Sequence, residues 1–312
     1  MLGAGKRVSF AKHLKKSAKS KNLEICLYSY ELTKEVPIDL VSEIIIGLKW
    51  NDSNLIKDLS AIIQKKDIQM ILAFVDPAVE ILPILKHLFP NIYIPCCSSE
   101  ISQIMFDKKL ATLWFKEHSI PIPKTHTCAD PFSFPLIAKP RKGSASQGLI
   151  IINSSPDLEN FYNNFDKDKY LIQEYIANGI EYTVDAFVSQ KKEIISIVPR
   201  IRLEQAGGES IRSQTVHNIE IETLSKNILQ NGDFIGPITL QFIENPKTHN
   251  LFLMEINPRY GGAVITSFAA GADTTLCLID ECFSRPLKKL DWKKNILMTR
   301  YFKEVIFYAD NY

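Results

Sequence analysis

The stretch Leu251–Gly262, L-F-L-M-E-I-N-P-R-Y-G-G, decides how this chain is interpreted. It begins as a strand-like run and ends in a Pro-Arg-Tyr-Gly-Gly turn. Glu255 and Asn257 stand two positions apart, and side chains at that spacing in a strand point to the same face. Their carboxylate and amide oxygens can therefore meet at one point. Hard oxygen donors of this kind suit Mg²⁺, which proteins usually hold with one or two carboxylates and substrate phosphates.

A second strand is predicted beside this one. Pro237–Ile243, P-I-T-L-Q-F-I, has a strand-like pattern, and the residues that follow, E-N-P-K-T-H-N, contain the breakers of a turn. An antiparallel hairpin whose turn centres near Lys247 puts Gln241 opposite Leu253 and diagonal to Glu255, on the same face. A slip of one residue would turn Gln241 to the other face. A plain surface hairpin with an incidental glutamate is the alternative.

The composition is that of an ordinary soluble globular chain. The chain has 312 residues, 46% hydrophobic and 23% charged, which favours about two or three domains. A net charge of +2 argues against a general affinity for nucleic acid. No apolar run reaches about 18 residues, and no apolar segment follows the basic N-terminus, so neither a transmembrane helix nor a secretory signal is expected. The six cysteines lack C-x-x-C or zinc-finger spacing, which indicates reduced thiols in a cytoplasmic protein.

Strands that alternate with helices predict a small α/β domain over about residues 1–100. We expect helices at 54–66 and 79–88, and strands at Leu23–Tyr28, Glu43–Leu48, Met70–Val75 and Ile92–Pro95. The opening L-G-A-G-K-R resembles a dinucleotide-binding turn, but the third glycine and a preceding strand are missing, which argues against an NAD site. Whether the first strand is absent stays open. Such a domain can bind part of a substrate at its strand ends, where Asp76 lies.

The second informative stretch is Phe134–Ile152, F-P-L-I-A-K-P-R-K-G-S-A-S-Q-G-L-I-I-I. A strand leads to Lys139, and a second strand leaves the loop that follows. Because small residues let backbone N–H groups approach phosphate oxygens, this loop can bind phosphates through Gly143, Ser144, Ser146 and Gly148. Leucine follows Gly148, so the Walker pattern is absent. A plain β-turn is the alternative.

M-E-I-N-P-R, preceded by I-T-L-Q-F-I, resembles the metal-binding end of the ATP-grasp superfamily, in particular the ATP-grasp halves of the carbamoyl phosphate synthetase large subunit. Those halves carry glutamine at the position of Gln241. The resemblance runs from about Ile101 to Phe283. It implies an α/β N-terminal Rossmann-like (pre-ATP-grasp) domain and an α+β ATP-grasp fold. The implied division is the N-terminal domain (1–100), a connecting helical segment (101–128), the lid (129–178) and the base with the metal site (179–312).

The resemblance also implies roles for single residues. Lys108 and Lys139, with the small-residue loop, would bind the nucleotide phosphates. Glu174 would accept from the adenine amino group, and the backbone around Tyr175 and Ile176 would read the ring edge. Glu181 would hold the ribose hydroxyls.

The metal site implied by the resemblance consists of Gln241, Glu255 and Asn257, which would hold Mg²⁺, with Mn²⁺ as an alternative. Arg259 would clamp the transferred phosphoryl group, and Lys139 would share in catalysis. Three arginines lie around a Gly-Gly segment and can bind carboxylate or phosphate: Arg200, Arg202 and Arg212. Ala206 stands where the carbamoyl phosphate synthetases carry a histidine.

The implied function is that of an ATP-dependent ligase, which activates a carboxylate as an acyl phosphate for attack by an amine. No histidine or cysteine is needed for this, because the carboxylate is already ionised. A bicarbonate-phosphorylating enzyme of the carbamoyl phosphate synthetase type and a non-catalytic ATP-binding protein are the alternatives. ATP and unknown carboxylate and amine substrates are the expected partners, without nucleic acid or membrane. The substrates, the number of metal ions and the oligomeric state, including a homodimer, stay open.

Overall fold

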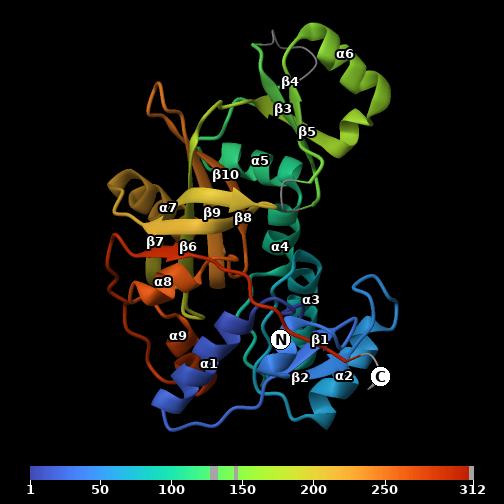
Figure 1. Cartoon of the computed structure of the whole chain (residues 1–312), viewed down its shortest axis with the longest axis vertical. Helices are drawn as coiled ribbons and strands as arrows, with labels where there is room; N and C mark the ends of the chain where they lie inside the picture. The colour runs from blue at the N-terminus through green and yellow to red at the C-terminus, as the bar shows by residue number, and fades with distance from the viewer. Residues whose placement is uncertain (127–132, 144–146, 309–312) are drawn as a thin grey trace.

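The computed structural model describes residues 1–126, 133–143 and 147–308. Ser144 and Ser146 of the predicted phosphate loop, and Cys128, lie outside the described residues. A small sheet with a helix stands above a large sheet, and the N-terminal part forms the opposite end of the molecule (Figure 1). The five described cysteines are free thiols. None of the described helices has the length and apolar character that crossing a membrane requires.

The N-terminal part alternates helices with short parallel segments. Its elements are α1 (Val8–Ser20), β1 (Tyr28–Glu31), η1 (Pro37–Leu40), β2 (Glu43–Ile46), α2 (Leu55–Lys65) and α3 (Asp76–Leu88). β1 and β2 pair in parallel, and Met70 forms a single parallel bridge with Tyr93. The strands predicted around residues 23–28, 70–75 and 92–95 are therefore present only in part, because few of their residues form ladder pairs.

A short extended segment precedes the glycine turn at the N-terminus. Leu2 forms parallel bridges with both Tyr30 and Ala73, which places it between those two segments. Gly3 then turns the chain with φ 65°, and a Cβ built there would lie 2.6 Å from Cγ2 of Val75. Leu2 is thus the one residue of this segment that bridges its neighbours among the described residues, and a single residue leaves no hydrophobic pattern in the sequence.

The connecting segment begins with two helices, α4 (Ser99–Phe106) and α5 (Lys108–Glu117). Asp107 separates them, and its side chain accepts from the backbone N–H groups of Lys109 at 2.9 Å and Leu110 at 3.3 Å. The same carboxylate holds Arg141 at 2.6 Å. The start of α5 is therefore tied to the residues that follow β3.

The small sheet unit consists of β3 (Leu136–Pro140), β4 (Ile150–Ile152) and β5 (Tyr170–Glu174), covered by α6 (Ser155–Asn164), with η2 (Lys167–Lys169) before β5. Its strands are antiparallel in the order β4-β3-β5. Leu136, Ile152 and Phe161 belong to its own small core. This unit carries Lys139 on β3 and Glu174 at the end of β5.

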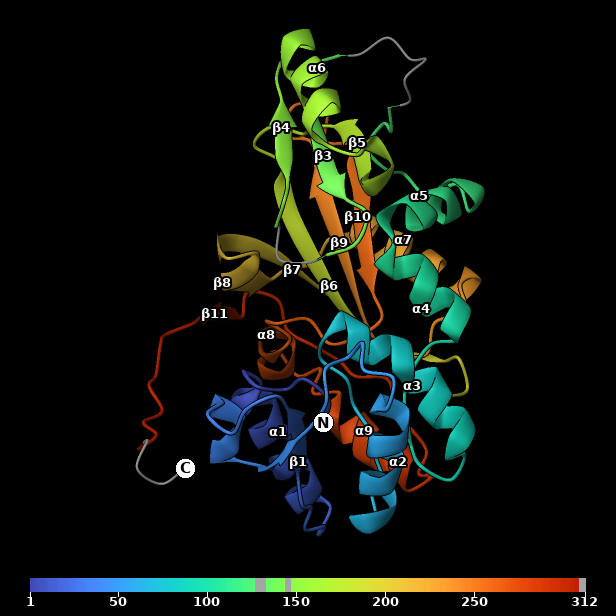
Figure 2. The same ribbon diagram turned by 90° about the vertical axis from the view of Figure 1, so that its right-hand side faces the viewer.

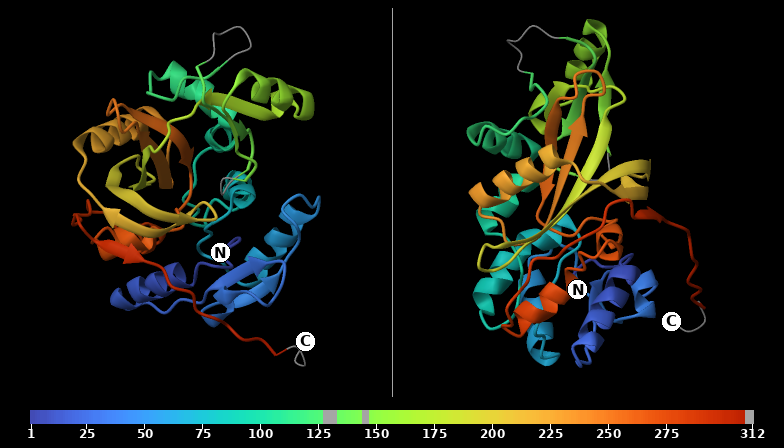
Figure 3. Two further views of the ribbon diagram at one scale, coloured as in Figure 1. Left: turned by 45° about the horizontal axis from the view of Figure 1, so that its top comes forward. Right: turned by 90° about the vertical axis from the view of Figure 1, so that its left-hand side faces the viewer.

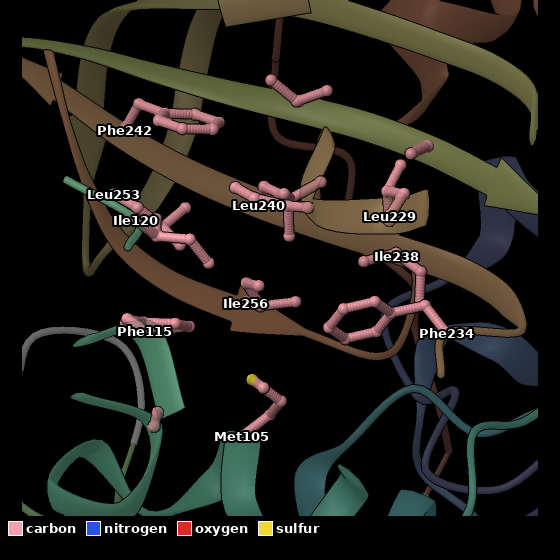
Figure 4. Close-up of a cluster of buried hydrophobic side chains, with 14 of the residues drawn as sticks. Met105, Phe115, Ile120, Leu229, Phe234, Ile238, Leu240, Phe242, Leu253 and Ile256 are labelled. Atoms are coloured by element: carbon pink, nitrogen blue, oxygen red, sulfur yellow. The ribbon is translucent and has the colours of Figure 1, made fainter. Parts of the chain in front are cut away.

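The large sheet is antiparallel throughout, in the order β10-β9-β6-β7-β8-β11. Its strands are β6 (Ile180–Val188), β7 (Ile194–Ala206), β8 (Glu209–Thr215), β9 (Gly236–Glu244), β10 (Leu251–Asn257) and β11 (Leu297–Thr299). The sheet curls strongly (Figure 3). Its main core lies between the sheet, α4, α5 and α7 (Ile219–Asn231), with Phe115, Phe234, Leu240, Leu253 and Ile256 at its centre (Figure 4).

The C-terminal part contains two short helices, α8 (Ile265–Ala269) and α9 (Thr275–Cys282). Residues 295–308 contribute only β11 to the large sheet, where it pairs with β8. Beyond it the chain leaves the sheet (Figure 2), and Phe302 is 95% exposed. The apolar alternation there lacks a sheet partner among the described residues.

Candidate active site

The hairpin of β9 and β10 places Gln241 directly opposite Glu255. Leu253 lies opposite Phe242, so the simple register would have paired Met254 with Gln241 and turned Glu255 away. A β-bulge between Leu253 and Glu255 adds one residue and restores the shared face. The predicted pairing of Gln241 with Leu253 is therefore wrong. Leu253 pairs one residue away, with Phe242, and the bulge adds a second residue, so that Gln241 lies opposite Glu255.

After the bulge, Ile256 faces the core and Asn257 is buried beside Glu255. The Nδ2 group of Asn257 donates to Oε1 of Glu255 at 2.9 Å. Its Oδ1 accepts from Nη2 of Arg259 at 3.5 Å. The strand end is thus a linked set of a carboxylate, an amide and a guanidinium.

A cavity of about 540 Å³, called here the large cavity, lies between the small sheet unit and the large sheet. It brings together ten of the residues singled out in the sequence: Lys108, Lys139, Gly143, Glu174, Tyr175, Ile176, Glu181, Arg202, Gln241 and Glu255. The other described candidates are outside its lining: Asp76, Gly148, Arg200, Arg212, Asn257 and Arg259. A further cavity of about 400 Å³ under the N-terminal parallel segments contains none of these residues.

Lys139 lies on β3 inside the large cavity. Its Nζ donates to Oε1 of Gln173 on the neighbouring strand β5 at 3.1 Å, a partner that no sequence pattern marks. Burial lowers the pKa of Lys139 to about 8, while the carboxylates of Glu255 and Glu181 oppose that shift and Lys108 adds to it. At neutral pH most of the Lys139 side chain therefore stays charged, and its hydrogen-bond partner is a neutral amide. Such an ammonium group suits the binding of an anion.

Lys108 is the first residue of α5, and its Nζ donates to the carbonyl of Gly143 at 2.9 Å. Its backbone N–H donates to the carbonyl of Arg141 at 2.9 Å. The ion pair between Asp107 and Arg141 fixes the same connection. Asp107 is recognisable in the sequence as a helix cap, but its contact with Arg141 depends on the fold.

Glu174 and Glu181 lie on either side of the turn that joins the two sheets. The N–H of Tyr175 donates to the carbonyl of Pro135 at 3.1 Å, so this amide is already engaged. Glu181 accepts from Nη1 of Arg202 at 2.9 Å. The N–H of Tyr175 is therefore not free to bind the edge of an adenine ring. Other backbone groups of this segment, including those of Ile176, would have to do so.

Arg202 connects the two sides of the site. Besides Glu181, it donates to Oε1 of Gln241 at 3.2 Å and to the carbonyl of Gly208 at 2.8 Å. Arg200 lies deeper, where it holds Asp185 at 2.7 Å and is 2% exposed. Arg212 is exposed on β8 and lines neither cavity, because its neighbours on the strand take the inward positions.

A second cavity of about 290 Å³, called here the small cavity, adjoins the large one. The two share four lining residues: Arg202, Gly208, Gln241 and Glu255. The small cavity is also lined by Asp76 and Arg259, which form an ion pair at 2.6 Å. Asp76 is the first residue of α3 rather than the end of a regular strand, and it does line the site. Arg7 and Glu209 line it too, although no sequence pattern marks them as site residues.

Comparison with known proteins agrees with this geometry. Residues 166–304 match a family model described as "ATP-grasp in the biosynthetic pathway with Ter operon". The C-terminal section of a carbamoyl phosphate synthase large chain from Methanopyrus kandleri is 24% identical over 202 residues, 57% of this chain and 35% of that protein. Residues 166–304 are therefore of the ATP-grasp family.

Two further comparisons support the ATP-grasp assignment. A D-alanine--D-alanine ligase from Petrotoga mobilis is 31% identical over 117 residues, 34% of this chain and 38% of the ligase. The solved N5-carboxyaminoimidazole synthetase from Staphylococcus aureus, complexed with ADP, has a TM-score of 0.74 at 18% identity, covering 93% of this chain and 78% of that chain. That likeness shows an ATP-grasp fold. The chain spans about a third of the length of the curated relatives it matches.

Proposed function

We propose that this protein is an ATP-dependent ligase that activates a carboxylate as an acyl phosphate for attack by an amine. One observation carries the proposal: the two cavities meet at Gln241 and Glu255. A nucleotide in the large cavity and an acceptor in the small cavity would therefore present their reacting groups to the same carboxylate. We further propose residues 1–100 as the Rossmann-like domain, 101–128 as the connecting segment, 129–178 as the lid and 179–312 as the base.

In this proposal the nucleotide occupies the large cavity. Lys108 and Lys139 would neutralise its phosphates, because each holds only a neutral oxygen in the absence of an anion. Gly143 and Gly148 have positive φ, 122° and 72°, which lets the loop between β3 and β4 turn its backbone toward phosphate oxygens. Adenine would lie against Glu174, the last residue of β5, and against Tyr175 and Ile176, which follow it. Ribose would lie against Glu181.

The oxygen donors at the strand ends fit Mg²⁺, and Mn²⁺ would accept the same set. Glu255 supplies one carboxylate and Gln241 one carbonyl, so nucleotide phosphates would complete the coordination. Asn257 turns its Nδ2 to Glu255, and its amide must rotate to become a ligand. No cluster of three His, Cys, Asp or Glu side chains that could hold a metal exists in the part of the chain that the structure describes. The metal would neutralise charge on the transferred phosphoryl group.

The residues around the junction would position and stabilise the reacting groups. A carboxylate oxygen of the acceptor attacks the γ-phosphorus, the bond to the β–γ bridging oxygen breaks, and ADP leaves. An amine then attacks the acyl carbon, loses a proton, and displaces phosphate. Arg259 would stabilise the transferred group from the small cavity and Lys139 from the large one, as fixed cations do in phosphoryl transfer.

Bicarbonate is the second candidate acceptor, favoured by the similarity to the Methanopyrus kandleri protein. In that case the first product would be carboxy phosphate, and ammonia would be the amine. Bicarbonate-stimulated ADP release that no organic carboxylate exceeds would favour this reaction over the first.

The test is Mg²⁺-dependent ADP release, measured with a panel of carboxylates, bicarbonate, amino acids and ammonia. Glu255→Ala should lower the rate about 10²-fold or more, because it removes the carboxylate that the metal needs. Glu220→Ala is the matched control, since Glu220 is exposed on α7. ADP release by Glu255→Ala at close to the rate of the unaltered protein would contradict the assignment. ATP binding without turnover under any acceptor would favour a non-catalytic role.

A further inference from the structure

The small cavity contains one cation that has no carboxylate partner. Arg7 lines this cavity, and no carboxylate oxygen of the described residues lies within 4.0 Å of its guanidinium nitrogens. The other three arginines of the lining are paired: Arg200 with Asp185, Arg202 with Glu181, and Arg259 with Asp76. Arg7 is therefore the guanidinium most able to receive an anion from outside.

The N-terminal turn brings Arg7 to this position. The N–H of Arg7 donates to the carbonyl of Ala4 at 2.6 Å, which closes the turn that begins at Gly3. α1 starts at the next residue, with no side-chain cap and no acidic residue in its first turn. Neighbouring Lys6 is exposed, whereas Arg7 is partly buried. The turn thus directs one of two adjacent cations into the cavity and the other into solvent.

The electrostatics around Arg7 favour an additional anion. Burial lowers the pKa of Arg7 to about 10, and the nearby Arg259 and Arg300 add to this shift, while Glu209 opposes it. Glu209 itself accepts a hydrogen bond from Arg300, so its negative charge is already paired with another guanidinium. A cation removed from water without a hydrogen-bonded partner is unfavourable, and an anion that enters would relieve that cost.

The space around the guanidinium is kept open by a glycine at the end of the stretch that decides the fold. A Cβ built on Gly262 would lie 3.2 Å from Nη1 of Arg7 and 3.3 Å from the carboxyl carbon of Glu209. This end of the cavity is lined by Arg7 and Gly262, while Gln241 and Glu255 line the part shared with the large cavity. A ligand that fills the small cavity can touch both ends.

We propose that the acceptor carries a second anionic group, a carboxylate or a phosphate, and that Arg7 binds it and determines specificity for it. This inference rests on the proposed ligase function. The reacting carboxylate would lie at Gln241 and Glu255, and the second anion at Arg7. A cavity of about 290 Å³ limits the acceptor to a small molecule. The nucleotide phosphates have their own cations, Lys108 and Lys139, and Arg7 does not line the large cavity.

The first experiment measures anion binding by thermal shift, with the protein saturated by MgADP so that the phosphate-binding lysines are occupied. The probes are inorganic phosphate, malonate, and three matched pairs that differ by one anionic group: glutamate and glutamine, aspartate and asparagine, 3-phosphoglycerate and glycerate. We expect saturable stabilisation by at least one of the more highly charged probes, at a concentration about tenfold or more below that of its less charged partner. Whether the carboxylate or the phosphate probes bind identifies the second group.

The variants separate Arg7 from its surroundings. Arg7→Gln should weaken binding of that probe about tenfold or more, and Arg7→Lys should weaken it less, because lysine keeps the charge but loses the planar fork. Lys6→Gln is the matched control and should bind as the unaltered protein does. No saturable binding of any probe, equal binding by Arg7→Gln, or equal losses in Arg7→Gln and Lys6→Gln would overturn the proposal.

A kinetic measurement distinguishes this inference from the proposed function. In ADP release, Arg7→Gln should raise the acceptor KM about tenfold or more, leave the KM for ATP unchanged, and abolish the preference for the more highly charged acceptor. An equal loss of kcat with every acceptor would make Arg7 merely structural and overturn the inference. Failure of MgADP to stabilise the protein would contradict the proposed function, while the phosphate and malonate measurements without nucleotide would still decide the role of Arg7.

Discussion

The two adjoining cavities differ in how their cations are held. In the large cavity, Lys108 and Lys139 donate to neutral oxygens, the carbonyl of Gly143 and the amide of Gln173. In the small cavity, three of the four lining arginines hold carboxylates, and Arg7 does not. Cations on neutral oxygens are available to a polyanion, whereas paired guanidinium groups form a fixed frame. The number of cations that line a cavity does not by itself locate an anion site. Only the cations without a carboxylate partner are available to a ligand.

The largest expected effect tests whether the paired arginines are a frame. Arg200→Met would leave the buried carboxylate of Asp185 without its cation, although Ser267 would still donate to it at 2.6 Å. We expect a loss of about 3–5 kcal/mol in the free energy of unfolding. Chemical denaturation of this variant measures the loss, and Arg212→Met, which removes an exposed arginine of the same sheet, is the control. Equal stability of the two variants would contradict the view that the paired arginines stabilise the fold.

The next effect concerns the availability of Lys139. Its pKa is lowered to about 8, so the ammonium is present below that pH and is lost as the pH rises through it. Phosphates bind the charged form, and the MgADP dissociation constant should therefore rise about tenfold per pH unit above pH 8 and be flat below pH 7. Calorimetric titration between pH 6.5 and 9.5 measures this. Lys139→Arg should remove the dependence in that range, and a persistent slope would assign it to another group.

A smaller effect tests the wall of the large cavity. A Cβ on Gly179 would lie 2.4 Å from Cδ1 of Ile243, and both residues line the cavity. Gly179→Ala should displace that side chain, cost about 1–3 kcal/mol in the free energy of unfolding, and weaken MgADP binding. Gly5→Ala is the control, because its Cβ would make only ordinary contacts of 3.5 Å or more. Thermal denaturation with and without MgADP gives both quantities. Unchanged stability and unchanged MgADP binding would mean that Ile243 moves aside at no cost.

The smallest effect on stability comes from the rim of the small cavity. Burial opposes ionisation of Glu209, but Arg300 and Arg7 hold the pKa of this carboxyl below its usual value. The side chains of Arg300 and Glu209 are 31% and 46% exposed, so Arg300→Met should cost at most about 1 kcal/mol in the free energy of unfolding. Glu209 would then be free to pair with Arg7, and phosphate or malonate binding should weaken. Unchanged anion binding would show that Glu209 does not compete for Arg7.

Most of the large cavity follows from local sequence patterns. Lys139 and Gly143 occur in one strand-loop segment, and Gln241 and Glu255 in one hairpin. Each pattern is complete within a few residues, so the sequence alone indicates it, and the resemblance to ATP-grasp proteins assigns its role. The start of α5 is also a local pattern, because Asp107 caps the helix that Lys108 begins.

The register of the metal hairpin could not be predicted in the same way. The sequence indicates the two strands and their shared polar face, but the pairing of Gln241 with Glu255 depends on a bulge at Met254. A bulge leaves no periodic signal, because it is one extra residue in an otherwise alternating strand. The first N-terminal strand escaped prediction for a related reason, since only Leu2 bridges its neighbours.

The sequence by itself determined the resemblance of this chain to ATP-grasp proteins, its strand-loop segments and the polar residues of the large cavity, because these are local patterns with fixed periods. The tertiary structure alone decided the small cavity, which joins Arg7, Asp76, Glu209 and Arg259 from distant positions in the chain. It also decided which cations are paired. An ion pair depends on a distance of a few ångströms between side chains, and these side chains come from segments that are far apart in the sequence. The availability of Arg7 is the consequence that only the fold reveals.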